Sequence, residues 1–82
     1  MAGEIMNKQR RKELERIADL LSECMSGLES VKEEEQEAYD NLPEGIQYSE
    51  RGEAMQENVD DLDYVISDLD QVIDSVNEII NK

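Results

Sequence analysis

One short break divides this chain of 82 residues into two segments with the same helical periodicity. The break is the stretch from Asn41 to Gly45, which contains Pro43, the only proline of the chain. Proline loses a backbone hydrogen bond inside a helix, and it disfavours the helical conformation of the residue before it. The sequence therefore predicts a first helix over about 4–41, a turn over about 42–48 and a second helix over about 49–81. Ser49 is the expected N-cap of the second helix.

Apolar residues recur at alternating steps of three and four on both sides of the break, which is the heptad pattern of amphipathic helices that pack along one seam. The seam of the second segment is uninterrupted: Met55, Val59, Leu62, Ile66, Leu69, Ile73, Val76 and Ile80. The seam of the first segment is interrupted only by a glutamate: Leu14, Ile17, Leu21, Cys24, Leu28, Val31, Glu35, Ala38 and Leu42.

The two seams match each other as the arms of an antiparallel hairpin folded at Gly45. This register pairs Leu28 with Leu62 and Glu35 with Met55, and it needs no loop beyond the predicted turn. Registers offset by a heptad also match, and a continuous helix through Pro43 in a parallel coiled coil is an alternative. We expect an all-α fold, with residues 1–82 forming a single domain of two long amphipathic helices.

A second apolar line runs along the second predicted helix, with its members seven residues apart. A lone pair of helices buries too little surface to be comfortably stable, so this line is expected to pack against something. The sequence favours self-association into a four-helix bundle over a groove for a specific partner. The predicted self-association residues are Leu20, Val65, Val72 and Ile79.

The net charge of -14 is unevenly distributed. Acids and bases balance within residues 1–32, whereas Arg51 and Lys82 are the only bases in residues 33–82. Such a field repels nucleic acid and anionic membranes and attracts basic surfaces. The expected partner is therefore a protein with a basic surface, while nucleic acid and membrane are not expected partners.

Acidic residues crowd around the predicted turn and along the second helix. Several lie at the C-terminal end of the first helix, where acids oppose the helix dipole, so the arrangement costs stability. Residues that lower stability without an evident structural gain are often functional. Tyrosine is also a common anchor residue in protein interfaces. The alternative is that these acids only solubilise the protein. The predicted partner-binding residues are Glu33, Glu34, Glu37, Tyr39, Asp40, Glu44, Tyr48, Glu53, Glu57, Asp60, Asp61 and Asp63.

The residues needed for catalysis are poorly represented. Histidine is absent, and Cys24 falls on the predicted seam, where a thiol behaves as a small hydrophobe. The acids at 60–63 lack the ligand spacing and glycine of a calcium loop. We expect no enzymatic activity, no metal site and no cofactor. The basic block Lys8–Arg16 is expected to pair with acids of the second helix. The single cysteine and the lack of a membrane-spanning run suggest a cytoplasmic location.

A resemblance to known proteins is carried by the segment EEEQEAYDNLPEGIQYSERGEAMQENVDDLDYVISDLDQVIDSV. It is similar to small acidic proteins, mostly of unassigned function, encoded by bacteria, phages and mobile elements, and it is clearest at Glu37–Glu44 and Ser49–Gly52. The resemblance transfers no activity residue by residue. It implies a setting in which an inhibitor of a host nucleic-acid-binding system, of the DNA-mimic or anti-defence type, is plausible. The leading hypothesis is such an acidic interaction module, and the alternative is a homo-oligomeric coiled-coil scaffold.

Overall fold

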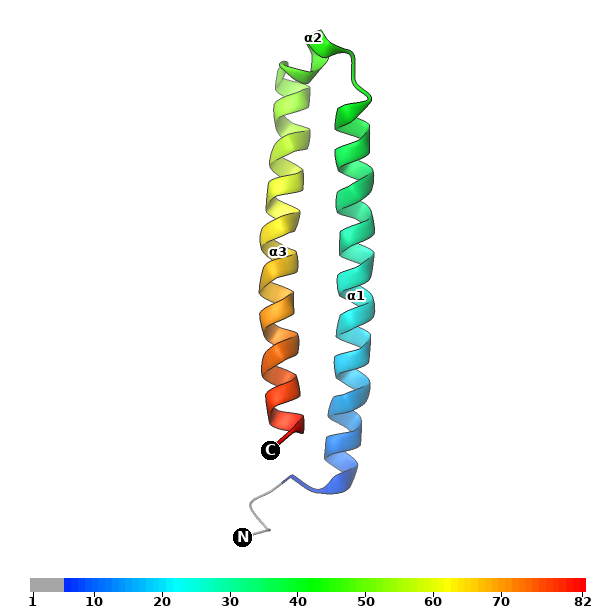
Figure 1. Ribbon diagram of the computed structural model, residues 1–82, viewed down its shortest axis with the longest axis vertical. Coiled ribbons are helices and arrows are strands. Elements are labelled where there is room, and N and C mark those ends of the chain that lie inside the picture. Colours follow the sequence, from blue (N-terminus) through cyan, green and yellow to red (C-terminus); the bar gives the residue numbers. More distant parts are fainter. Residues whose placement is uncertain (1–5) are drawn as a thin grey trace.

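Two long helices account for most of the molecule. The computed structural model describes residues 6–82, which contain α1 (Lys8–Asp40), α2 (Glu44–Gln47) and α3 (Glu50–Ile80), with no strand among them. α1 and α3 lie side by side and run in opposite directions, and the short α2 connects them at one end (Figure 1). The Cα atoms extend over 65 × 15 × 12 Å, so the molecule is a narrow rod. The predicted all-α class is confirmed.

α1 begins later than the sequence analysis placed it. Residues 4 and 5 of the predicted helix lie outside the described part, and Met6 and Asn7 precede the helix. The start is fixed by Asn7, whose side-chain oxygen accepts a hydrogen bond of 2.8 Å from the backbone N–H of Arg10. Asparagine at this position satisfies one of the N–H groups that have no partner within the helix.

The predicted turn over 42–48 is not entirely irregular, because it contains α2. Pro43 precedes α2, and its carbonyl oxygen accepts from the backbone N–H groups of Ile46 and Gln47. The Gln47 side chain donates to the carbonyl oxygens of Tyr39 at 3.1 Å and Asp40 at 3.3 Å. These bonds satisfy carbonyl groups at the end of α1, so Gln47 ties the connecting segment to that helix.

Gly52 allows α2 and α3 to meet closely. A Cβ atom at this position would lie 2.1 Å from the carbonyl oxygen of Gln47, whereas one at Gly45 would meet nothing within 4 Å. The glycine that the junction requires is therefore Gly52, and not the predicted folding point Gly45. Ser49 precedes α3 as predicted, but its hydroxyl donates to the carbonyl oxygen of Ile46 and makes no capping hydrogen bond.

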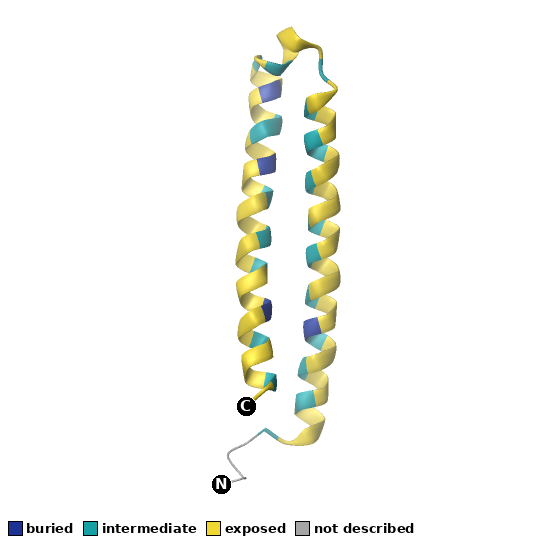
Figure 2. Ribbon diagram, viewed as in Figure 1, coloured by how far each residue is buried: buried dark blue, intermediate teal, exposed yellow. Residues whose placement is uncertain are grey.

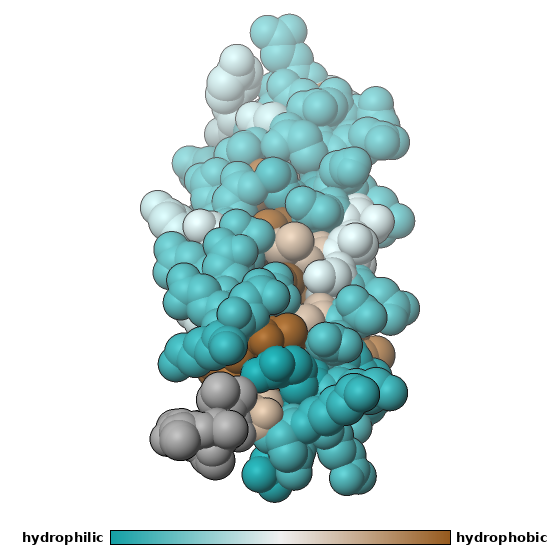
Figure 3. Space-filling model, turned by 60° about the horizontal axis from the view of Figure 1, so that its bottom comes forward, coloured by the Kyte–Doolittle hydropathy of each residue, from teal (hydrophilic) through white to brown (hydrophobic). Residues whose placement is uncertain are grey.

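The interior of the rod is a thin seam between α1 and α3. The buried and half-buried residues lie where these helices face each other, and the outer sides are exposed (Figure 2). The only buried hydrophobic residues among 6–82 are Ala18, Val59 and Ile73. On the side shown in Figure 3, hydrophobic side chains form a narrow band between hydrophilic flanks. The seam is therefore only partly covered by the two helices.

The predicted seam is correct for α3 and wrong for part of α1. Every predicted seam position of α3 is buried or half-buried. In α1, the predicted positions Cys24, Val31 and Ala38 are exposed, and their chain neighbours Met25, Lys32 and Tyr39 are half-buried in their place. Near Ile17 and Cys24, the predicted seam positions and the residues that follow them are all apolar. The pattern of α1 alone therefore does not decide how the helix is rotated about its axis.

The pairing register also differs from the predicted one. Asn58 donates a hydrogen bond of 3.0 Å to the Glu35 carboxylate, and Lys32 forms an ion pair with Asp63. The prediction placed Met55 beside Glu35, so the observed register is displaced by about one helical turn. The residues of α2 lengthen the connection, and this moves α3 relative to α1.

Candidate functional site

One side of the rod carries an uncovered apolar face, defined here as the exposed Leu20, Cys24 and Val31 and the half-buried Ile17 of α1 with the exposed Val65, Val72 and Ile79 of α3. In each helix most of these residues are seven positions apart, which places them on one side of a helix that packs along a heptad seam. Leu20, Val31, Val65, Val72 and Ile79 are between 39% and 51% exposed. The predicted self-association residues Leu20, Val65, Val72 and Ile79 all belong to this face.

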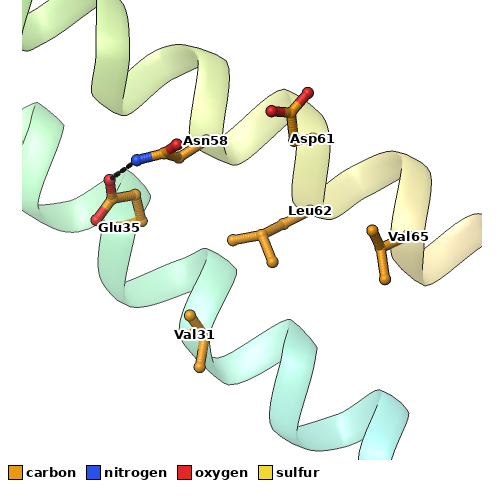
Figure 4. A pocket seen from close by; sticks show the side chains of 6 residues that line it. All are labelled: Val31, Glu35, Asn58, Asp61, Leu62 and Val65. Atoms are coloured by element: carbon orange, nitrogen blue, oxygen red, sulfur yellow. Dashed lines mark hydrogen bonds between the residues drawn. The ribbon is translucent and has the colours of Figure 1, made fainter.

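A groove at the turn-proximal end shows that both helices contribute to the same face. It has a volume of about 360 Å³ and is lined by Val31, Glu35, Asn58, Asp61, Leu62 and Val65. Leu62 points from α3 toward α1, while Asp61 points away from α1, and the hydrogen bond from Asn58 to Glu35 closes one end (Figure 4). The groove therefore has an apolar floor and carboxylates at its rim.

Two further depressions continue the face toward the free ends of the helices. One lies along α3 and has a volume of about 450 Å³, with Val72, Val76 and Ile79 among its lining residues. The other lies at the start of α1 and is lined by Met6, Arg10, Glu13 and Leu14. The charged lining residues change along the rod, because those of the groove near the turn are acids, whereas a base and an acid, Arg10 and Glu13, line the depression at the other end.

The predicted acidic binding residues do not form one surface. In α1, Glu35 and Tyr39 face α3, so the exposed acids Glu33, Glu34, Glu37 and Asp40 lie on the outer side of α1. By the same helical geometry, the exposed Glu53, Glu57 and Asp60 lie on the outer side of α3. We call these sets the α1 edge and the α3 edge. They are on opposite sides of the rod and approach each other only near Glu44.

The other predicted binding residues are placed differently from one another. Tyr48 is 78% exposed at the turn, whereas Tyr39 is half-buried between the long helices. Asp63 pairs with Lys32 across the seam, and Asp61 lies at the rim of the groove. Tyr48 is therefore the accessible aromatic side chain of the pair that the sequence analysis selected.

Two ion pairs explain the shifted pKa values in the described part of the chain. The hydrogen bond with Asp63 raises the pKa of the Lys32 ammonium above its ordinary value. Burial partly opposes this rise, and the charges of Asp63, Glu29 and Glu33 add to it. The hydrogen bond with Glu13 raises the pKa of Arg16. Lys32 therefore carries a firmly held positive charge on the half-buried side of α1.

The predicted pairing between the basic block Lys8–Arg16 and the last acids of α3 is not found. Among residues 6–82, the ion pairs of the structure join Arg16 to Glu13 and Lys32 to Asp63. The first turns of α1 extend beyond the end of α3 (Figure 1), so much of the basic block has no neighbouring helix to pair with. Within the block, Arg16 pairs with Glu13, and Arg11 is half-buried with its Nε and Nη2 atoms buried, whereas Lys8, Arg10 and Lys12 are exposed.

Sequence reasoning missed that Cys24, Val31 and Arg10 belong to the uncovered side. Cys24 was expected to be buried, but its thiol is exposed. The available signal was the spacing of Arg10, Ile17, Cys24 and Val31, which are seven residues apart, in the same way as Val65, Val72 and Ile79. The apolar members of this series, Ile17, Cys24 and Val31, were assigned to the seam, and Arg10 was assigned to the basic block.

The described residues hold no group of three metal-ligating side chains placed around one point, and none of their helices is both long and apolar enough to cross a membrane. Comparisons with protein-family models, with curated proteins and with solved structures found no match to this chain.

Proposed function

We propose that this protein is a small interaction module that acts as an antiparallel helical hairpin. Two copies associate through the apolar face into a four-helix bundle, and the outer acidic side chains bind a basic surface of a partner protein. The observation that carries this proposal is the division of the exposed surface into an apolar face and two acidic edges. The apolar face is stabilised when another surface packs against it, whereas the acidic edges are well solvated and need no such contact.

Self-association is supported by how little the two helices bury on their own. The only buried hydrophobic residues among 6–82 are Ala18, Val59 and Ile73. Fully burying a Val, Leu or Ile side chain stabilises by about 1.5–3 kcal/mol, so covering a half-exposed one contributes about 1 kcal/mol. A second copy would cover such side chains on both molecules at once, and the acidic edges would remain on the outside of the bundle.

Binding to a basic surface is supported by the continuity of charge along α3. Between Glu53 and Glu78 this helix contains no base, and its acids are Glu53, Glu57, Asp60, Asp61, Asp63, Asp68, Asp70, Asp74 and Glu78. At about 1.5 Å per residue, one carboxylate occurs per about 4 Å of helix. Phosphates along one strand of duplex DNA are spaced about 3.4 Å apart. α3 is thus suited to a channel of Lys and Arg side chains that binds nucleic acid, and the protein would act as an inhibitor of the DNA-mimic type.

Charge reversal at separate places tests the acidic edges. One variant changes Glu53, Glu57 and Asp60 to Lys, and a second changes Glu33, Glu34 and Glu37 to Lys. A matched control changes the exposed Glu15, Asp19 and Glu23 to Lys, which alters the net charge equally but away from the turn. Each is immobilised, and the proteins captured from a bacterial lysate are compared along a salt gradient.

We expect the control variant to capture a partner protein that at least one of the two edge variants no longer captures. This capture should weaken steeply as the salt concentration rises, because salt screens exposed charges. Equal loss in all three variants would mean that only net charge matters. Unchanged capture in all three, or capture that is insensitive to salt, would mean that the acids solubilise the protein and do not bind.

The uncovered apolar face also favours a second function, that of a homo-oligomeric scaffold. Changing Val65, Val72 and Ile79 to Ser separates the two functions. If the variant is monomeric by sedimentation and captures no partner, the scaffold role is favoured. If the monomer still captures the partner in a salt-sensitive way, the acidic edges carry the function.

A further inference from the structure

Opposite charges lie at the two ends of the apolar face. At one end the groove that contains Val31 is bordered by Glu35 and Asp61. At the other end, Arg10 continues the seven-residue series of the α1 part of the face and lines the depression beside Leu14 together with Glu13, whose carboxylate is ion-paired with Arg16. Among the described residues, the apolar side chains of the face lie between these two charged ends.

The middle of this charge pattern coincides with the middle of the apolar face. Within α1, Cys24 lies about midway between Arg10 and Glu35. The hydrogen bond between Glu35 and Asn58 shows which residues of α1 and α3 lie at about the same height along the rod. Counting down α3 from that contact at about 1.5 Å per residue places Leu69 at the height of Cys24, and Val72 lies within about one helical turn of that height. A second copy related by a two-fold axis near Cys24 would therefore place its apolar face on the apolar face of the first copy and its basic end on the acidic end.

We infer that the two copies pack with their turns at opposite ends of the bundle, so that α1 lies on α1 and α3 lies on α3 of the second copy. This inference rests on the self-association proposed above. In this arrangement the Arg10 end of each copy lies against the Glu35 and Asp61 end of the other, and opposite charges meet on both sides of the axis. The basic turns of α1 that extend past α3 also meet an acidic partner.

The alternative arrangement places both turns at the same end, with α1 lying on α3 of the second copy. It brings the Glu35 end of one copy against the Asp61 end of the other, so like charges meet near the turns. Neighbouring helices are antiparallel in both arrangements, so the helix dipoles do not distinguish them. The side-chain charges select the arrangement with opposite ends, because like-charge contacts across an interface are unfavourable.

The selected arrangement has a consequence for partner binding. The helical distance along α3 from Val72, near the axis, to Glu50, beside the turn, is about 33 Å at about 1.5 Å per residue, so the two acidic turns are at least about 65 Å apart. The dimer is then a bivalent rod that presents the same acidic surface at both ends. A partner with two correctly spaced sites would bind it more tightly than a single site would.

Oxidation of Cys24 tests the contact between the two α1 helices. Cys24 is exposed on the apolar face, and it is the only cysteine of the chain. In the inferred arrangement the two thiols meet near the axis, where a disulfide requires Cα atoms about 4.4–6.8 Å apart. Mild oxidation should give a covalent dimer. In the same-end arrangement Cys24 lies on Val72 of the second copy, and the two thiols are on diagonal helices, too far apart to join.

Distance measurement between spin labels tests the direction of the two copies independently. A label at Tyr48→Cys in a Cys24→Ser background reports the separation of the turns. The inferred arrangement predicts at least about 65 Å, and the same-end arrangement predicts less than about 30 Å, given helices spaced about 8–10 Å apart. A control label at Glu23→Cys, near the middle of the rod, should give less than about 40 Å in either dimer.

A long turn-to-turn distance with a short control distance supports the inference. Short distances at both positions overturn the orientation but leave self-association intact. If neither label shows dipolar coupling and sedimentation gives a monomer, the proposed self-association fails and the inference fails with it.

Discussion

Replacing Gly52 by Ala tests the packing of the connection between α2 and α3. The new Cβ would lie 2.1 Å from the Gln47 carbonyl oxygen, 2.6 Å from its carbonyl carbon and 2.8 Å from its Cα. These are all backbone atoms, so no side-chain rotation relieves the overlap. Restoring an ordinary contact of at least 3.4 Å requires the backbone to move by more than about 1 Å.

The expected cost follows from two opposing effects. Forcing an extra carbon into a packed site costs about 1–3 kcal/mol, and we expect the upper part of this range because backbone must move. Alanine is about 1 kcal/mol more favourable than glycine inside a helix. The free energy of unfolding should therefore fall by about 2 kcal/mol, which lowers Tm by about 8–16 °C for a domain of this size.

Gly27 provides a matched control within the same chain. It lies inside α1, and a Cβ there would meet nothing within 4 Å. Gly27→Ala should raise the free energy of unfolding by about 1 kcal/mol through helix propensity alone. Thermal and urea unfolding are followed by circular dichroism at one protein concentration, because self-association makes Tm depend on concentration. If Gly52→Ala is as stable as Gly27→Ala, the close approach at the junction is refuted.

Three further substitutions test local features of the fold. Asn7→Ala removes the side-chain acceptor at the start of α1 and should cost about 1 kcal/mol in urea unfolding, whereas Asn7→Asp should be nearly neutral; equal effects would rule out capping. Because the folded pKa of Lys32 is raised above its unfolded value, the stability from its ion pair is fully present below the unfolded lysine pKa and is lost as pH rises through the folded one. NMR titration should show that Asp63→Asn lowers the pKa of Lys32, and no change would refute the assignment. Glu35→Leu replaces a half-buried carboxylate beside Leu62 and should stabilise by about 1 kcal/mol, since Asn58 is exposed and regains water; a loss of stability would show that the polar pair is needed.

The break at Pro43 and the heptad spacing were sufficient to predict two long helices and the inner side of α3. Local sequence determines these features because a helix needs only its own backbone hydrogen bonds, and a proline in the interior of a helix interrupts them. The seam of α3 was unambiguous, since only one line of large apolar residues follows the seam period without interruption. The exposure of Val65, Val72 and Ile79 beside that seam followed from the same spacing.

The inner side of α1, the register and the acidic edges were decided by the tertiary structure. Both Cys24 and Met25 are acceptable seam residues, and only the position of α3 selects Met25. That position depends on α2 and on the approach of Gly52 to Gln47, which involve residues whose local pattern predicts only a turn. The split of the acids into two opposite edges follows from the rotation of α1. Sequence periodicity determines that a helix has an inner side, but where two lines of side chains could both face inward, the neighbouring helix decides which line is buried.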